Sequence, residues 1–148
     1  MQFFLELIHN RVLLAAISGW VAAQALKVVF HFLIEQEWDF KRFFGLGGMP
    51  SSHACVVCAL ATAVGISSGF NSANFAISTV LALVVMTDAA GVRRAAGKQA
   101  VVINRIAEDL FEKQRGFSYE RLKELLGHSP FEVMIGALIG VLLGFLIM

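Results

Sequence analysis

Charge is scarce along most of this chain, and several long runs contain no charged residue at all. Charged residues make up 16% of the 148 residues, whereas hydrophobic residues make up 57%. This composition does not suit a soluble domain and indicates an integral membrane protein. The net charge of +1 gives no indication of a nucleic-acid partner, so none is expected.

Cysteine is also rare, which excludes a zinc site built from two cysteine pairs. Cys55 and Cys58 share one apolar segment, where this spacing most often provides two small packing residues. A cleavable signal peptide is not expected either. The first apolar segment is too long, contains Lys27, and is not clearly followed by a small-residue cleavage site.

Four apolar segments are each about long enough to cross, or nearly cross, a bilayer core of ~30 Å at ~1.5 Å per residue. They cover residues 12–34, 54–70, 73–87 and 131–148. Residues 99–114 show the spacing of an amphipathic helix that lies on the membrane or covers the site. The sequence therefore predicts one all-α domain over residues 1–148, a polytopic membrane helix bundle of about four transmembrane helices plus amphipathic cytoplasmic helices.

Lysine and arginine are distributed unevenly among the connecting segments. With four spans, residues 35–53 and 88–130 share one side of the membrane, and only Arg11 lies on the other side near the first span. The positive-inside rule places the two basic segments in the cytoplasm and both termini outside.

The stretch Gly-Gly-Met-Pro-Ser-Ser-His ends at His53 and precedes the second apolar segment. Its glycines permit backbone angles that bring amides close to a ligand, and Ser51 or Ser52 can cap the helix expected from Ala54. The amides at that helix start attract an anion. His53 would stand over the same pocket and exchange protons near neutral pH.

Two other groups of polar residues are candidates for the same site. Gln24, Lys27 and His31 share one face of the first span. A lysine inside a membrane normally faces a cavity or a partner, although Lys27 could instead extend to the interface. After the third span come Asp88, two arginines and a lysine, which suit phosphate oxygens or form an ordinary basic flank on lipid headgroups.

The last span is preceded by His-Ser-Pro-Phe-Glu, from His128 to Glu132. Ser129 and Glu132 have the spacing of a capping box, which leaves His128 without a structural explanation. Glycines spaced by four residues then favour close helix packing, within the chain or between the subunits of a homodimer. They are Gly136, Gly140 and Gly144.

With this topology, the candidate side chains approach one membrane face. Two histidines and a cationic clamp suit phosphoester hydrolysis, in which one histidine attacks phosphorus and the other protonates the departing alkoxide. The clamp neutralises charge on the equatorial oxygens. This scheme needs no metal ion or other cofactor, although Asp88 could instead ligate Mg²⁺ together with the substrate phosphate.

Pro-Ser-Ser-His at residues 50–53 resembles the Pro-Ser-Gly-His signature of the type-2 phosphatidic acid phosphatase superfamily. Together with Asp-x2-Gly-Val-Arg-Arg-x2-Gly-Lys-Gln and Leu-Gly-His-Ser-Pro, it is similar to a small, divergent branch of bacterial and plastid membrane proteins. That branch is called acid phosphatase/vanadium-dependent haloperoxidase related. The resemblance covers nearly the whole chain.

The resemblance implies that His53 is the general acid and that His128 is a nucleophile oriented by Glu132. The topology predicts a site on the cytoplasmic side, and the resemblance to bacterial proteins implies a bacterial inner membrane. The catalytic residues expected are His53, Asp88, His128 and Glu132. The substrate-binding residues expected are Lys27, Ser51, Ser52, Arg93, Arg94 and Lys98.

The sequence thus predicts a membrane phosphatase that hydrolyses a lipid phosphate monoester through a phosphohistidine intermediate. Phosphatidylglycerophosphate, phosphatidate or a polyprenyl phosphate would each suit the resemblance, and nothing in the sequence selects among them. One alternative is a non-enzymatic membrane protein that binds anionic lipid or a partner. Another is a transporter component that uses Lys27 and Asp88 as a buried charge pair.

Overall fold

The computed structural model describes residues 2–39, 43, 48–111, 122 and 127–148, and all regular structure within them is helical. Three of the helices are long and apolar enough to cross a membrane, and the shorter α3 is also apolar. This confirms the predicted all-α membrane bundle. The helices are α1 (Gln2–Ile8), α2 (Arg11–Glu35), α3 (Ser52–Ser68), α4 (Ala73–Ala90), α5 (Val92–Phe111) and α6 (Pro130–Ile147).

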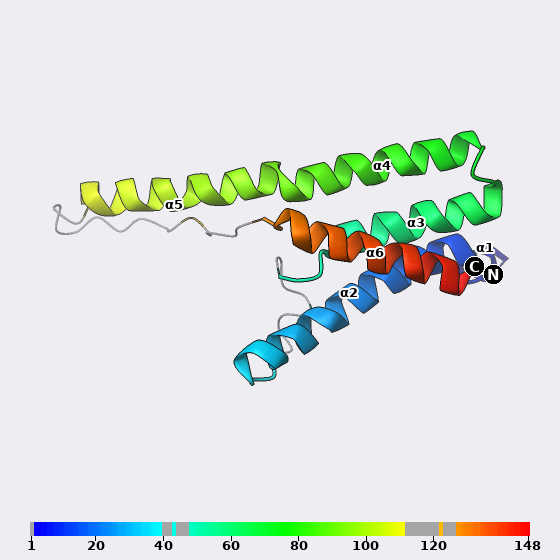
Figure 1. Cartoon of the computed structure of the whole chain (residues 1–148), viewed down its shortest axis with the longest axis horizontal. Helices are drawn as coiled ribbons and strands as arrows, with labels where there is room; N and C mark the ends of the chain where they lie inside the picture. The colour runs from blue at the N-terminus through cyan, green and yellow to red at the C-terminus, as the bar shows by residue number, and fades with distance from the viewer. Residues whose placement is uncertain (1, 40–42, 44–47, 112–121, 123–126) are drawn as a thin grey trace.

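Helix α3 is the centre of the bundle and packs against α2, α4 and α6 (Figure 1). Most of its side chains are small and buried, among them Ala54, Cys55 and Ala59. Lipid tails are as apolar as the helices, so membrane helices associate through close packing of small residues. The composition of α3 therefore explains its central place.

Helix α6 packs on α3 through its regularly spaced glycines. A Cβ atom on Gly136 would overlap the carbonyl oxygen of Ser51, and one on Gly140 would overlap that of Cys55. Helix α2 also approaches Cys55, at Gly19. The glycine face of the last span is thus occupied within the chain. A homodimer stays a prediction, and this face is not available for it.

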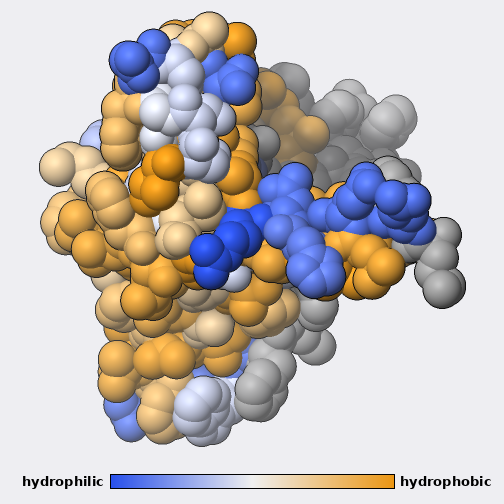
Figure 2. Space-filling model, turned by 90° about the vertical axis from the view of Figure 1, so that its right-hand side faces the viewer, coloured by the Kyte–Doolittle hydropathy of each residue, from blue (hydrophilic) through white to orange (hydrophobic). Residues whose placement is uncertain are grey.

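Large apolar side chains lie on the outside of the bundle. Leu146 is 81% exposed, Met134 70% and Ile77 69%. Figure 2 shows the end of the molecule where the termini lie, with apolar side chains over most of the visible flank. Small residues inside and large apolar residues outside are the arrangement expected when the surrounding medium is hydrocarbon.

Both chain termini lie at one end of the bundle, and α3 and α6 begin at the opposite end (Figure 1). The Arg11 guanidinium donates to the carbonyl oxygen of Met148 at 3.2 Å, which joins the start of α2 to the end of the chain. The starts of α3 and α6 therefore share one end with the ends of α2 and α4. This agrees with the predicted even number of spans.

Helix α5 begins earlier than the predicted amphipathic helix and continues the direction of α4 beyond the bundle (Figure 1). Gly91 joins the two helices with right-handed backbone angles, φ −102° and ψ −78°, so the chain does not turn there. Among the described helices α5 contacts only α4. The amphipathic helix is confirmed, but it does not lie across the starts of α3 and α6.

The close contact of α3 and α6 predicts a specific loss of stability. The variant Gly140→Val should lower the free energy of unfolding by about 1–3 kcal/mol, because its side chain has no space against the α3 backbone. Thermal unfolding in detergent measures this loss. Leu142→Phe is the matched control, since Leu142 is 60% exposed on the same helix. Equal unfolding temperatures for both variants would contradict the packing described.

Candidate active site

The first turn of α3 is fixed by Ser51, which is completely buried. Its hydroxyl oxygen accepts from the Ala54 N–H at 3.4 Å and caps the helix. Its own N–H donates to the carbonyl oxygen of Glu132 at 3.1 Å. This backbone hydrogen bond holds the start of α3 against the first turn of α6. Of the preceding glycines, Gly48 has φ +80°, and Gly47 lies outside the described residues.

The predicted capping box at the start of α6 is present, and its carboxylate also contacts a histidine. Ser129 Oγ accepts from the Glu132 N–H at 3.3 Å, and Glu132 Oε2 accepts from the Ser129 N–H at 3.1 Å. The same oxygen lies 3.1 Å from Nδ1 of His128, which is 3% exposed. An ionised carboxylate only accepts, so His128 Nδ1 carries the proton and, in the neutral ring, Nε2 keeps its lone pair.

The two candidate histidines come together from distant parts of the chain. The ring centroids of His53, in the first turn of α3, and His128, just before α6, are 6.1 Å apart. The planes of the two rings are inclined by 62°. Their proximity follows from the α3–α6 contact. His53 lies two residues after Ser51, whose N–H donates to the Glu132 carbonyl oxygen, and His128 directly precedes the capping box that contains Glu132.

Lys27 reaches this group from the middle of α2. It is 5% exposed, and its ammonium donates to Ser52 Oγ at 3.2 Å. The Glu132 carboxylate is near enough to act electrostatically on this ammonium. The alternative that Lys27 extends to the membrane interface is therefore wrong. The same face carries Gln24, whose buried Oε1 has no hydrogen-bond partner among the described residues.

The second group of charges is only partly near the histidines. Ala89, in the last turn of α4, packs with Ala54 and Val133, so the half-buried Asp88 lies beside the starts of α3 and α6. Arg94 and Lys98 are exposed on α5. The side chain of Arg93 lies outside the described part of the structure. Of the expected clamp, Asp88 is therefore the part near the starts of α3 and α6, whereas the described basic side chains lie along α5.

The structure brings six of the predicted site residues into one cluster, at the end of the bundle away from the termini. Gln24 was not among the predicted site residues, although its spacing from Lys27 places it on the same helix face. Asp88 is adjacent to the cluster. The six residues are Lys27, Ser51, Ser52, His53, His128 and Glu132.

The two cysteines of α3 are packing residues. Cys55 and Cys58 are both buried free thiols, and Cys58 Sγ lies 3.7 Å from Met86 Sδ. In the part of the chain that the structure describes, no three His, Cys, Asp or Glu side chains gather in a group that could hold a metal ion.

Comparison with known proteins shows the family of the chain. A family model described as the Divergent PAP2 family matches residues 8–143. The chain belongs to this family. It is also 40% identical over 149 residues to the "Uncharacterized membrane protein YuiD" of Bacillus subtilis (strain 168). The matched region covers 94% of each chain. No solved structure matches the chain.

The region matched by the family model includes every residue of the six-residue cluster, from Lys27 to Glu132. The chain is therefore an integral membrane protein related to the membrane phosphatases, with its polar cluster at one end of the bundle.

The hydrogen bond from His128 to Glu132 predicts the position of the imidazole proton. In protein labelled with ¹⁵N-histidine, two-bond ¹H–¹⁵N spectra should show neutral His128 protonated on Nδ1. Glu132→Ala should shift part of the population to the Nε2–H form, because the acceptor of Nδ1–H is gone. His9, which directly follows α1, is the internal control. An Nε2–H ring in the unsubstituted protein would contradict this geometry.

Proposed function

We propose that this member of the Divergent PAP2 family is a membrane phosphatase that hydrolyses a lipid phosphate monoester through a phosphohistidine intermediate. One observation carries the proposal. Two histidines lie with ring centroids 6.1 Å apart, and one of them has its Nδ1 held by a carboxylate. The resemblance to phosphatases and the family membership add support.

In the first step of the proposed reaction, His128 acts as the nucleophile. Its Nε2 lone pair attacks phosphorus, and the bond from phosphorus to the alkoxide oxygen breaks. His53 donates a proton to that oxygen, so the alcohol leaves neutral. Glu132 stabilises the positive charge that develops on the His128 ring through the Nδ1 hydrogen bond.

In the second step, water replaces the histidine on phosphorus. Neutral His53 takes a proton from the water as its oxygen attacks, and the bond between phosphorus and His128 Nε2 breaks. Inorganic phosphate leaves, and both histidines return to their starting states. The phosphorus must come within ~3–3.5 Å of the attacking nitrogen.

The phosphoryl oxygens require positive charge and hydrogen-bond donors. Lys27 supplies a buried ammonium beside Ser52, and the N-terminal amides of α3 point their dipoles toward an anion in the same place. In this proposal Asp88 orients a basic partner, and Arg93, Arg94 and Lys98 complete the clamp when α5 or its side chains approach the substrate. A phosphate dianion would thus have a compensating charge inside the membrane end of the bundle.

An apolar cavity lies farther along the bundle from the cluster, and the part of its wall nearest the cluster includes Met86. It has a volume of about 300 Å³ and lies between α3, α4 and α6, with Met86, Val141 and Phe145 in its wall. Met86 also packs on the Ala54, Ala89 and Val133 group beneath the histidines. A chain that starts at the polar cluster would pass Met86 before it reaches these apolar walls, which would favour a lipid substrate over a soluble phosphate. We place this end of the bundle in the cytoplasm, because the basic segments follow the positive-inside rule.

The proposal predicts which histidines are required for phosphate release. Purified protein in detergent should release phosphate from phosphatidate or phosphatidylglycerophosphate, with or without a chelator. His128→Ala and His53→Ala should each lower the rate by about 10²–10⁴-fold, because each removes a group that acts in the transition state. His9→Ala should retain the full rate, since His9 directly follows α1, which lies at the other end of the bundle.

Full activity in either active-site variant would contradict the assigned roles. Loss of activity on chelation would instead favour Mg²⁺ held by Asp88 and the substrate phosphate. If no lipid phosphate is hydrolysed, the protein is better described as an anionic-lipid or partner-binding protein. In that case the binding should survive both histidine substitutions and weaken with salt.

A further inference from the structure

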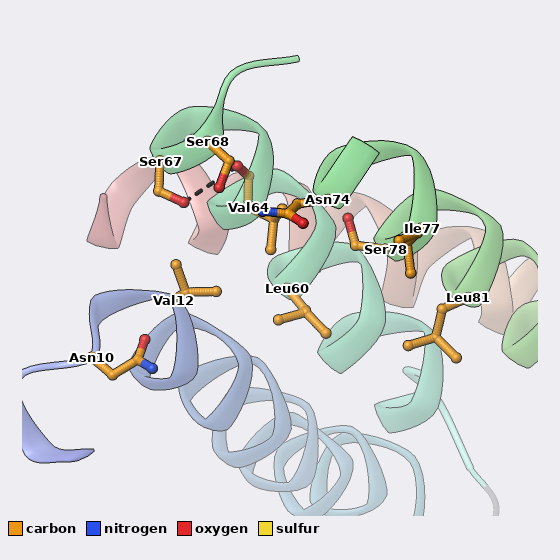
Figure 3. Close-up of a pocket in the computed structure, with 10 residues that line it drawn as sticks. All are labelled: Asn10, Val12, Leu60, Val64, Ser67, Ser68, Asn74, Ile77, Ser78 and Leu81. Atoms are coloured by element: carbon orange, nitrogen blue, oxygen red, sulfur yellow. Dashed lines mark hydrogen bonds between the residues drawn. The ribbon is translucent and has the colours of Figure 1, made fainter. Parts of the chain in front are cut away.

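A second pocket lies at the opposite end of the bundle from the histidines, at the end that carries both termini. It has a volume of about 450 Å³ and is formed where α2 begins, α3 ends and α4 begins (Figure 3). Among the described residues α2 and α4 make no direct contact, so α3 forms the floor of a groove between them. None of the residues proposed for catalysis lines this pocket.

The side chains of this pocket change from polar to apolar with depth along the helices. Ser67 and Ser68 are in the last turn of α3, and Asn74 is in the first turn of α4. Leu60 of α3 and Leu81 of α4 line the pocket about two turns deeper. Figure 3 shows the polar side chains near the helix ends and the leucines farther along the same helices. Such an order matches an amphiphile with its headgroup outermost.

The polar part of the pocket carries hydrogen-bonding groups and no charge. None of the side chains that line the pocket belongs to Asp, Glu, Lys, Arg or His. Ser78, which is 6% exposed, donates its hydroxyl to the Phe75 carbonyl oxygen at 2.9 Å, and Ser67 donates to the Val64 carbonyl oxygen at 3.3 Å. Both serine oxygens therefore remain as acceptors for an incoming hydroxyl. Asn10 uses its side-chain oxygen to accept from the Leu13 N–H, which leaves its amide N–H groups as donors.

We infer that this pocket binds a lipid whose headgroup is uncharged and carries a free hydroxyl, such as a diacylglycerol or a glycosyl diacylglycerol. A phosphate monoester would find no cation in the lining of this pocket, and the neighbouring Arg11 already donates to the Met148 carbonyl oxygen. A hydroxyl can both donate to the serine oxygens and accept from the amides of Asn10 and Asn74. The acyl chain would lie along Leu60 and Leu81. This inference does not depend on the proposed phosphatase activity.

The test is photolabelling in nanodiscs of phosphatidylcholine with a diacylglycerol that carries a diazirine in one acyl chain. The label should be recovered mainly on residues 60–81. Asn74→Ala should lower the labelling of this segment about tenfold, because the headgroup loses a hydrogen-bond partner. Asn71→Ala is the matched control, since Asn71 is exposed at the same end of the bundle and does not line the pocket.

Competition with unlabelled lipids of identical chains tests the headgroup. The His128→Ala variant is used here, so that phosphatidate is not converted to diacylglycerol during the experiment. Diacylglycerol and galactosyl diacylglycerol should compete about tenfold better than the acetylated diacylglycerol, which has lost its hydroxyl, and better than phosphatidate. Equal competition by all four lipids, or equal labelling of Asn74→Ala and Asn71→Ala, would show an ordinary lipid-facing groove and would overturn the inference.

Discussion

The close approach of α3 and α6 is the contact on which the rest of the structure depends. It requires glycine at Gly136 and Gly140, because the α3 backbone at Ser51 and Cys55 occupies the space of a side chain. Once the helices approach so closely, the Ser51 N–H reaches the Glu132 carbonyl oxygen. The ring centroids of His53 and His128 then lie 6.1 Å apart. The distance between α3 and α6 is set by direct contact with the α3 backbone, so little space is left inside the bundle.

Glu132 joins helix capping to the proposed chemistry. Its carboxylate completes the cap of α6 and contacts His128 Nδ1 with the same oxygen, so one side chain stabilises the helix start and fixes the ring. The backbone carbonyl of Glu132 holds Ser51. This sharing explains how a chain of 148 residues forms a polar cluster with few side chains. It also means that a loss of Glu132 affects stability and histidine orientation together.

The apolar runs and cap residues predicted the helices of the bundle well, because lipid-spanning length and capping are local properties. The cluster of Lys27, Ser51 and the histidines was predicted from topology, since segments that end at one membrane face must approach each other. The path of α5 was not predicted. Gly91 looks like a helix terminator, and only its right-handed angles show that the helix continues. The positions of Arg94 and Lys98 depend on the path of α5, and the local pattern of charges does not predict that path.

The most direct test of the account is to trap the phosphorylated protein. Protein mixed with phosphatidate labelled in its phosphate should be stopped with alkali after milliseconds to seconds, since phosphohistidine survives base and not acid. The account predicts transient label on the peptide that contains His128, and none in the His128→Ala variant. Rapid release of phosphate with no labelled protein at any time, or label on a residue other than His128, would contradict it.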